Sequence, residues 1–212
     1  MPRLAPMTTL AGSLRSSLAD LLEEVGPDAP TLCDGWATRD LAAHLVLRER
    51  RPDAALGIAV RAFAGHMSSV QNSLAAEPWP QLVDKVRNRS VLLISPVDSL
   101  FNTTEYFVHL EDVRRAEPEW KPAPEEPELE AVLWRQLRQR GRAFFRRSPV
   151  GVILELPDGQ THVAAEGEPV VTLVGPASEL TLYAYGRGEQ ALVEIQGPAD
   201  AIASFRGTAL GI

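Results

Sequence analysis

The stretch that decides the fold is residues 102–116, which read NTTEYFVHLEDVRRA. It contains no Gly or Pro, and its apolar residues recur at helical spacing, which predicts a helix with one broad buried face. Glu105 and His109 are four residues apart in the middle of that face. An unpaired charge is costly to bury, so an inward carboxylate and imidazole indicate a shared partner. A divalent metal ion is such a partner, because an oxygen and a nitrogen one helical turn apart can bind the same ion.

A third candidate ligand lies upstream, in residues 34–48, which read DGWATRDLAAHLVLR. His44 falls between two leucines on the apolar face of a second predicted helix. Two histidines and one glutamate are the ligand set of an open catalytic zinc site, whose fourth position takes water or substrate. The same set also suits nickel or iron. The sequence therefore predicts a divalent metal, zinc before the others, held by His44, Glu105 and His109.

Each of these ligands has a simpler explanation when it is taken alone. A histidine among leucines is usually a core residue bonded to a backbone carbonyl, and Glu105 could form an ion pair with Arg48. Three such groups on apolar faces favour the metal site instead. A metal in an open site lowers the pKa of a bound water or thiol, and so supplies a nucleophile at neutral pH.

Residues next to the ligands could take part in the chemistry. Asp112, three residues after His109, could hold a neighbouring imidazole as a second-layer partner, or form an ordinary surface pair. Arg48 could hold a substrate carboxylate through two hydrogen bonds, or only neutralise Glu105. Glu111 and Asp112 are the candidates for a general base.

Two residues farther along the sequence have weaker signals. Cys33 could reach the metal or act as a redox thiol, but a small buried hydrophobic residue is the favoured interpretation. Arg187 follows a glycine that ends a predicted helix, and it could reach an anionic ligand. An exposed arginine without a binding role is the simpler expectation for that position.

Composition limits the classes of function. The 212 residues are enough for one domain or two small ones, with 45% hydrophobic and 23% charged residues. The net charge of −7 argues against nucleic acid and anionic membranes as partners. The longest aliphatic run, residues 91–94, is far too short to span a bilayer, and the amino terminus lacks a signal-peptide core. A single cysteine excludes an internal disulfide and favours a cytoplasmic protein.

Helical periodicity dominates the chain up to residue 148, and we place the first domain at residues 1–148. The predicted helices span residues 9–25, 38–51, 52–67, 78–89, 98–116 and 128–147. The second helix begins at Ala37 or Thr38, with Thr38 as a possible cap and Asp40 in the first turn. A proline-rich acidic loop, residues 117–127, is a plausible hinge or lid. The arginines of the last helix are expected to form a solvated face.

The periodicity then becomes alternating, which predicts a second, small α+β domain at residues 149–212. Strands are expected at residues 150–156, 161–165, 169–174 and 191–196, and helices at 176–185 and 198–205. Asp158-Gly159 favours a hairpin with a type I′ turn between the first two strands. The resulting order is βββαβα.

Several motifs together resemble the DinB-like superfamily of metal-binding proteins. They are DGW at residues 34–36, DLxxHL at 40–45 and ExxxH at 105–109, followed by GPASEL at 175–180 and VEIQG at 193–197. The combination is most similar to the actinobacterial branch typified by mycothiol-dependent maleylpyruvate isomerase. The resemblance implies an α+β chain in two parts, an amino-terminal four-helix bundle and a small domain similar to sterol carrier proteins. One departure is Ala37, where a capping threonine is common in such proteins.

The resemblance also implies a function. The family's His, Glu and His ligands match His44, Glu105 and His109, and mycothiol would be the thiol co-substrate of an isomerase or transferase acting on a small anionic molecule. Arg48 and Arg187 are the candidates for binding that anion, and the protein would work as a monomer or a dimer. The competing interpretation is a non-catalytic metal-binding module that senses or carries a ligand.

Overall fold

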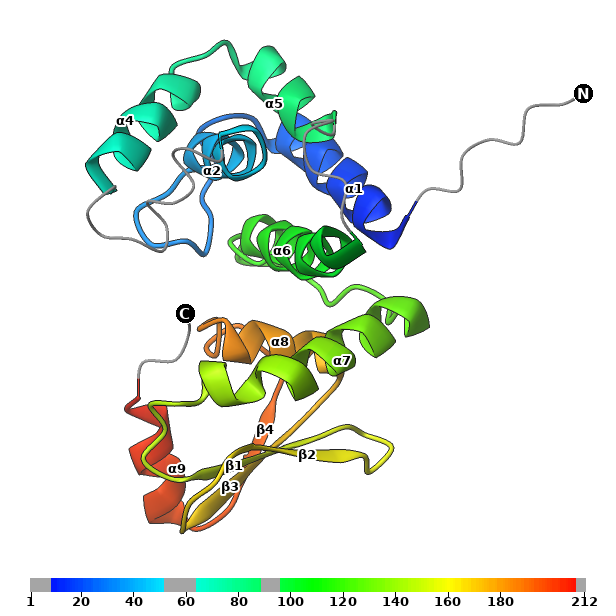
Figure 1. The fold of residues 1–212 in the computed structure, drawn as a ribbon, viewed down its shortest axis with the longest axis vertical. Coiled ribbons are helices and arrows are strands. Elements are labelled where there is room, and N and C mark those ends of the chain that lie inside the picture. Colours follow the sequence, from blue (N-terminus) through cyan, green and yellow to red (C-terminus); the bar gives the residue numbers. More distant parts are fainter. Residues whose placement is uncertain (1–8, 52–63, 89–95, 209–212) are drawn as a thin grey trace, which may run out of the picture. The chain divides into compact units, whose positions relative to one another are not determined.

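The computed structural model describes residues 9–51, 64–88 and 96–208. Within these ranges the chain forms eight helices and one four-stranded sheet, so the predicted α+β class is confirmed. The chain divides into two compact units, Met1–Pro122 and Ala123–Ile212, which are called unit 1 and unit 2 (Figure 1). None of the described helices is long and apolar enough to cross a membrane.

Unit 1 is helical in its described parts. Its helices are α1 (Leu10–Val25), α2 (Thr38–Arg50), α4 (Ala64–Ala75), α5 (Trp79–Arg87) and α6 (Pro96–Arg114). α1 packs on α5 and α6, and α2 packs on α4 and α5, so leucines from several helices are buried between them. Leu18, Leu22, Leu41, Leu47 and Leu82 are all fully buried there. The four-helix bundle implied by the resemblance stays a prediction.

The ends of α1 and α2 are fixed by local hydrogen bonds. Thr9 caps α1, because its Oγ1 accepts a hydrogen bond from the Gly12 amide at 3.2 Å, and Gly26 ends the helix with a φ of 82°. α2 begins at Thr38, one of the two predicted starts, but its cap differs from our expectation. Ala37 is the cap position, and the Asp40 carboxylate accepts from the Ala37 amide at 3.1 Å. Thr38 is therefore not the cap; its hydroxyl donates to the Gly26 carbonyl at 2.6 Å and so joins the two helices.

One predicted helix and the longest aliphatic run fall partly or wholly on residues that the structure does not describe. The helix predicted at residues 52–67 lies outside the described residues over 52–63, and its last four residues belong to α4. The aliphatic run 91–94 also lies outside them. The helices predicted near 78–89 and 98–116 are confirmed as α5 and α6.

Unit 2 is a sheet covered by helices. Its elements are α7 (Pro127–Phe144), β1 (Gly151–Glu155), β2 (Thr161–Ala165), β3 (Val170–Val174), α8 (Ala177–Ala184), β4 (Glu194–Gln196) and α9 (Ala199–Arg206). The strand order is β2-β1-β3-β4, with β1 and β3 parallel and the other two pairs antiparallel. Val152 pairs with Val171 and Leu154 with Leu173, and all four are fully buried. The predicted βββαβα order is confirmed.

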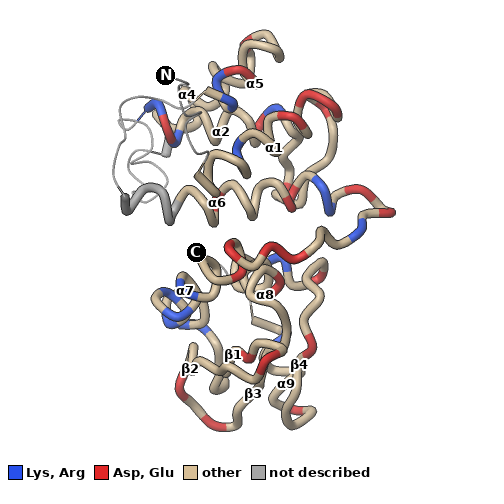
Figure 2. Tube along the Cα trace, turned by 90° about the vertical axis from the view of Figure 1, so that its right-hand side faces the viewer, with Lys and Arg blue, Asp and Glu red and all other residues tan. Residues whose placement is uncertain are grey.

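Helix α7 packs within unit 2. It contacts α8 and β2 (Figure 1). Its Leu133 and Leu137 are buried. The compact units consequently divide between Pro122 and Ala123, whereas we predicted domains of residues 1–148 and 149–212. As the boundary between separately folding domains, 148/149 stays a prediction. The outer face of α7 carries exposed arginines, as expected for a solvated surface (Figure 2).

The hairpin between β1 and β2 has a turn other than the predicted type I′. That type needs positive φ at both central residues, but only Gly159 has one, at 85°, and no described residue other than glycine does. The Gly159 amide donates to the Leu156 carbonyl and the Leu156 amide to the Gln160 carbonyl, both at 2.9 Å. Pro157 and Asp158 therefore form the turn, and Gly159 supplies the left-handed residue that follows it.

Candidate metal centre

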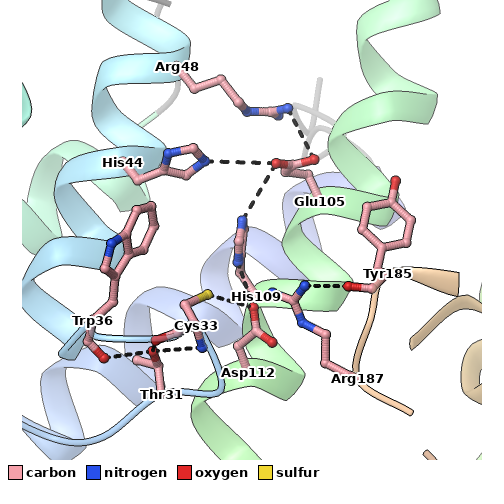
Figure 3. A network of polar contacts seen from close by, with 10 residues as sticks. All are labelled: Thr31, Cys33, Trp36, His44, Arg48, Glu105, His109, Asp112, Tyr185 and Arg187. Carbon is pink, nitrogen blue, oxygen red and sulfur yellow. Dashed lines mark hydrogen bonds and ion pairs between the residues drawn. The ribbon is translucent and has the colours of Figure 1, made fainter. Parts of the chain in front are cut away.

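Helices α2 and α6 bring the three predicted ligands together in unit 1. His44 comes from α2, and Glu105 and His109 come from successive turns of α6 (Figure 3). The Glu105 Oε1 atom lies 3.5 Å from His109 Nε2 and 4.0 Å from His44 Nε2. One ligand atom from each residue lies within 4.8 Å of the other two. The spacing predicted from the sequence therefore corresponds to a real cluster.

The separations in this cluster fit a metal ion better than they fit direct hydrogen bonds. Nitrogen and oxygen atoms joined by a hydrogen bond lie about 2.9 Å apart. Ligands bound about 2.0 Å from a tetrahedral zinc ion lie roughly 3.3 Å from one another. The observed 3.5 and 4.0 Å are closer to the second value, so small side-chain movements would complete a three-ligand site.

The cluster is largely shielded from water. The side chains of His44, Glu105 and His109 are 14%, 24% and 10% exposed. Arg48 pairs with Glu105, the most exposed of the three, with Nη1 3.4 Å from Glu105 Oε2, and its Nη2 donates to Asn102 Oδ1 at 2.5 Å. Of the two interpretations of Arg48, the ion pair with Glu105 is present, and binding of a substrate carboxylate stays a prediction. Asn102 was not anticipated as its partner.

The electrostatics of the cluster suit a cation. Burial alone would raise the pKa of Glu105, but the neighbouring His109 and His44 side chains and the charge of Arg48 hold it well below its usual range. Burial lowers the pKa of His44, although Glu105 opposes that shift. Burial would also lower the pKa of His109, but hydrogen bonds with Asp112, Cys33 and Glu105 raise it well above its usual value. In the absence of metal the carboxylate is thus ionised and His44 is neutral near pH 7.

Asp112 holds the other side of the His109 ring. Its Oδ2 atom lies 2.9 Å from His109 Nδ1, and the residue is fully buried. A proton on Nδ1 that is shared with Asp112 fixes the ring with Nε2 towards Glu105, and a metal ion would bind Nε2 in this orientation by displacing its proton. Because Asp112 is buried, the alternative of an ordinary surface pair is wrong.

Cys33 belongs to the same network. Its Sγ atom donates to Asp112 Oδ2 at 3.2 Å, and the preceding Leu32 amide donates to the Asp112 carbonyl at 2.9 Å. The thiol is half-buried and polar in its contacts, so the favoured interpretation as a simple buried hydrophobic residue is wrong. Cys33, His109 and Asp112 also have ligand-type atoms within 4.8 Å of one another.

Trp36 closes the loop that carries Cys33. Its carbonyl accepts a hydrogen bond from Thr31 Oγ1 at 2.8 Å, and its ring centroid lies 5.2 Å from that of His44. The tryptophan thus anchors this loop and also lies against a candidate ligand (Figure 3).

The remaining candidates have other contacts. Glu111 is buried and pairs with Arg114 and Arg115, so it faces arginines. Arg187 is in unit 2, where its guanidinium donates to the Tyr185 carbonyl at 2.5 Å. Its predicted role in binding an anionic substrate stays a prediction.

A buried charged cluster behind the centre was not predicted from the sequence. Glu49 Oε1 accepts hydrogen bonds from the Arg15 guanidinium and the Tyr106 hydroxyl, and the Arg15 guanidinium lies 4.8 Å from the Tyr106 ring centroid. All three residues are less than 9% exposed. Glu49 follows Arg48 and Tyr106 follows Glu105, so the cluster fixes the backbone of both helices next to residues of the centre. Nothing in the local periodicity distinguishes Glu49 from an ordinary exposed glutamate.

The role of Asp112 gives a testable expectation. Asp112→Asn keeps the shape of the side chain but removes its charge. The hydrogen bond that keeps a proton on His109 Nδ1 is therefore weaker in this variant. We expect the metal dissociation constant to rise about 10- to 100-fold. Competition with a chromogenic chelator would measure it, with Cys33→Ala as the control that removes only the thiol contact. An unchanged affinity in Asp112→Asn would show that the aspartate only packs there.

Comparison with known proteins bears on the fold. No known family model and no curated protein matches the sequence. Two solved structures of mycothiol-dependent maleylpyruvate isomerase are similar to the chain. The first, a mutant in which a histidine is replaced by alanine, has a TM-score of 0.62 at 16% identity, over 90% of this chain and 92% of that one. The second has a TM-score of 0.57 at 17% identity, over 90% of both chains. The resemblance noted in the sequence is confirmed in three dimensions: this chain has the fold of these isomerase structures.

Proposed function

We propose that the protein binds a divalent metal ion, zinc before nickel or iron, through His44 Nε2, the Glu105 carboxylate and His109 Nε2. We further propose that it is a thiol-dependent isomerase or transferase with mycothiol as co-substrate. The observation that carries the proposal is the convergence of these three ligand atoms within 4.8 Å, in a shielded position. Three protein ligands would leave one coordination position open for a small molecule.

The side chains around the ligands would prepare the site for this chemistry. When bound, the metal supplies a positive charge that lowers the pKa of a thiol at the open position. Asp112 keeps a proton on His109 Nδ1, at 2.9 Å, and so directs Nε2 towards the ligand cluster. Arg48, 3.4 Å from Glu105, keeps that carboxylate ionised and adds positive charge where an anionic substrate would approach.

Support for the choice of thiol and substrate comes from the fold. The two similar structures belong to an enzyme whose name specifies mycothiol dependence and isomerisation of maleylpyruvate, a small anionic molecule. A related activity in this chain would use Arg48 to hold an anionic group.

A metal-binding module without catalysis is the second candidate, and one observation favours it. Both carboxylates considered for a general base are already engaged, Glu111 with two arginines and Asp112 with His109 and Cys33. A protein that senses or carries a ligand would need no such base.

Titration of the cobalt form with mycothiol separates the two candidates. We expect saturable binding with a thiolate-to-cobalt absorption band, because the open position would accept the sulfur. S-methyl mycothiol is the control, since it cannot form a thiolate and should give no band. The zinc form with mycothiol is then assayed for isomerisation of maleylpyruvate. A fully loaded protein with no band and no saturable thiol binding would contradict the thiol-dependent enzyme and leave the metal-binding module.

A further inference from the structure

Unit 2 contains a cavity of about 420 Å³ between the end of α8, β4 and α9. Such a volume is within the range of small-molecule sites, which is roughly 300–1,000 Å³. Its walls include Tyr183, Gly188, Glu189, Val193, Ile195 and Arg206, all of them in unit 2. None of these residues belongs to the metal centre.

Tyr183 is the most buried residue of the cavity wall with a polar group. It is 8% exposed, and its ring lies nearly parallel to that of Phe205, at 7° and 5.9 Å between centroids. Gly188 packs against the same ring, because a Cβ atom there would lie 3.1 Å from it. Its hydroxyl has no hydrogen-bond partner within residues 9–51, 64–88 and 96–208. Burial raises the pKa of Tyr183, so the hydroxyl keeps its proton and can donate it.

The Tyr183 hydroxyl is not among the fully buried polar atoms that lack a hydrogen bond in the described residues, so it opens onto the cavity as a donor without a protein partner. Packing against Phe205 and Gly188 fixes the ring, so the hydroxyl cannot turn away to find a partner elsewhere. A bound molecule with an acceptor oxygen would give this donor a partner.

The cavity also carries two opposite charges that do not neutralise each other. Glu189 and Arg206 both line it and both lie near Tyr183, whose pKa they affect in opposite directions. In the described part of the chain neither residue has an ion-pair partner. Val193 and Ile195 supply an apolar wall between the strand and the helices.

We propose that this cavity binds a small zwitterion with an apolar side chain, of the α-amino acid class. Its carboxylate is held by Arg206 and the Tyr183 hydroxyl, its ammonium group by Glu189, and its side chain lies against Val193 and Ile195. A phosphate-like anion fits less well, because Glu189 would repel it. A long-chain lipid fits less well too, because it would leave both charges and the tyrosine hydroxyl without partners. The site is independent of the metal centre and of the thiol chemistry proposed above.

Calorimetric titration of the full chain with phenylalanine tests the proposal. Phenethylamine lacks the carboxylate, 3-phenylpropionate lacks the ammonium group, and palmitate represents a lipid. We expect saturable binding of phenylalanine in both metal-loaded and chelator-treated protein. Each analogue that lacks one charge should have a dissociation constant at least about tenfold higher. Palmitate should not compete.

Variants link the binding to the named residues. Arg206 and Glu189 are exposed, so Arg206→Gln and Glu189→Gln should not affect folding. Each variant should raise the dissociation constant for phenylalanine about tenfold. Tyr183→Phe should raise it by a smaller factor. Arg135→Gln, on the exposed face of α7, is the matched control and should bind as the parent protein does. Absence of saturable phenylalanine binding, equal affinity in Arg206→Gln and Arg135→Gln, or binding of palmitate alone would overturn the proposal.

Discussion

His109→Ala is expected to abolish stoichiometric metal binding while unit 1 keeps its helices. Both ring nitrogens of His109 are engaged, because Nε2 faces Glu105 at 3.5 Å and Nδ1 faces Asp112 at 2.9 Å. Its loss leaves two protein ligands, which hold a divalent ion weakly. The helices should survive because the core of unit 1 consists of fully buried leucines, and the metal is not needed to form it.

Elemental analysis and circular dichroism of the same samples measure both parts of this expectation. The parent protein, loaded and then desalted, should retain one divalent ion per chain, and His109→Ala only a small fraction of that amount. His66→Ala, an exposed histidine of α4, is the control for a general loss of imidazole. Should chelation alone unfold the parent protein, the metal would be structural and the open catalytic site would lose its main support.

Glu49→Ala is expected to destabilise unit 1 by about 3–5 kcal/mol. The Glu49 carboxylate accepts a hydrogen bond from the buried Arg15 guanidinium, and it also accepts from Tyr106. Removing the carboxylate leaves a buried cation uncompensated, and one Arg15 nitrogen, Nη1, already lacks a hydrogen bond among the described residues. The penalty therefore comes from the charge that remains rather than from the bond that is lost.

Urea unfolding followed by tryptophan fluorescence tests this second expectation. Glu166→Ala is the matched control, because Glu166 and Arg142 form an ion pair whose side chains are 79% and 78% exposed, and its loss should cost less than about 1 kcal/mol. The double variant Arg15→Met with Glu49→Leu removes both charges and should recover much of the lost stability. Equal midpoints for Glu49→Ala and Glu166→Ala would show that the buried pair contributes no more than a surface pair.

The parts of this molecule that were predictable from sequence depend on short-range patterns. Thr9 and Gly26 mark the two ends of α1, through a hydrogen bond and a dihedral angle that involve only near neighbours. Glu105 and His109 are four residues apart on one helix, so their convergence follows from helical geometry. His44 required the further inference that a polar residue between leucines points inward.

What could not be predicted depends on contacts between distant segments. The Cys33 thiol meets Asp112, 79 residues away, and Glu49 meets Arg15, 34 residues away. The spacing of apolar residues within one helix or strand gives no information about such distant pairs. The prediction of the hairpin turn type was wrong for a different reason. Asp-Gly is compatible with more than one turn type, and the preceding Pro157 favours the one observed.

The attachment of α7 to the sheet bears on how this chain can be inherited or recombined. Because Leu133 and Leu137 are buried on a helix that contacts α8 and β2, a break at residue 148 would strip that cover from the sheet and expose both leucines. A break within the proline-rich segment before Pro127 would leave it in place. Recombination that exchanges the second unit between related genes is therefore tolerated best when the crossover lies upstream of α7. The helix and the sheet are then exchanged together.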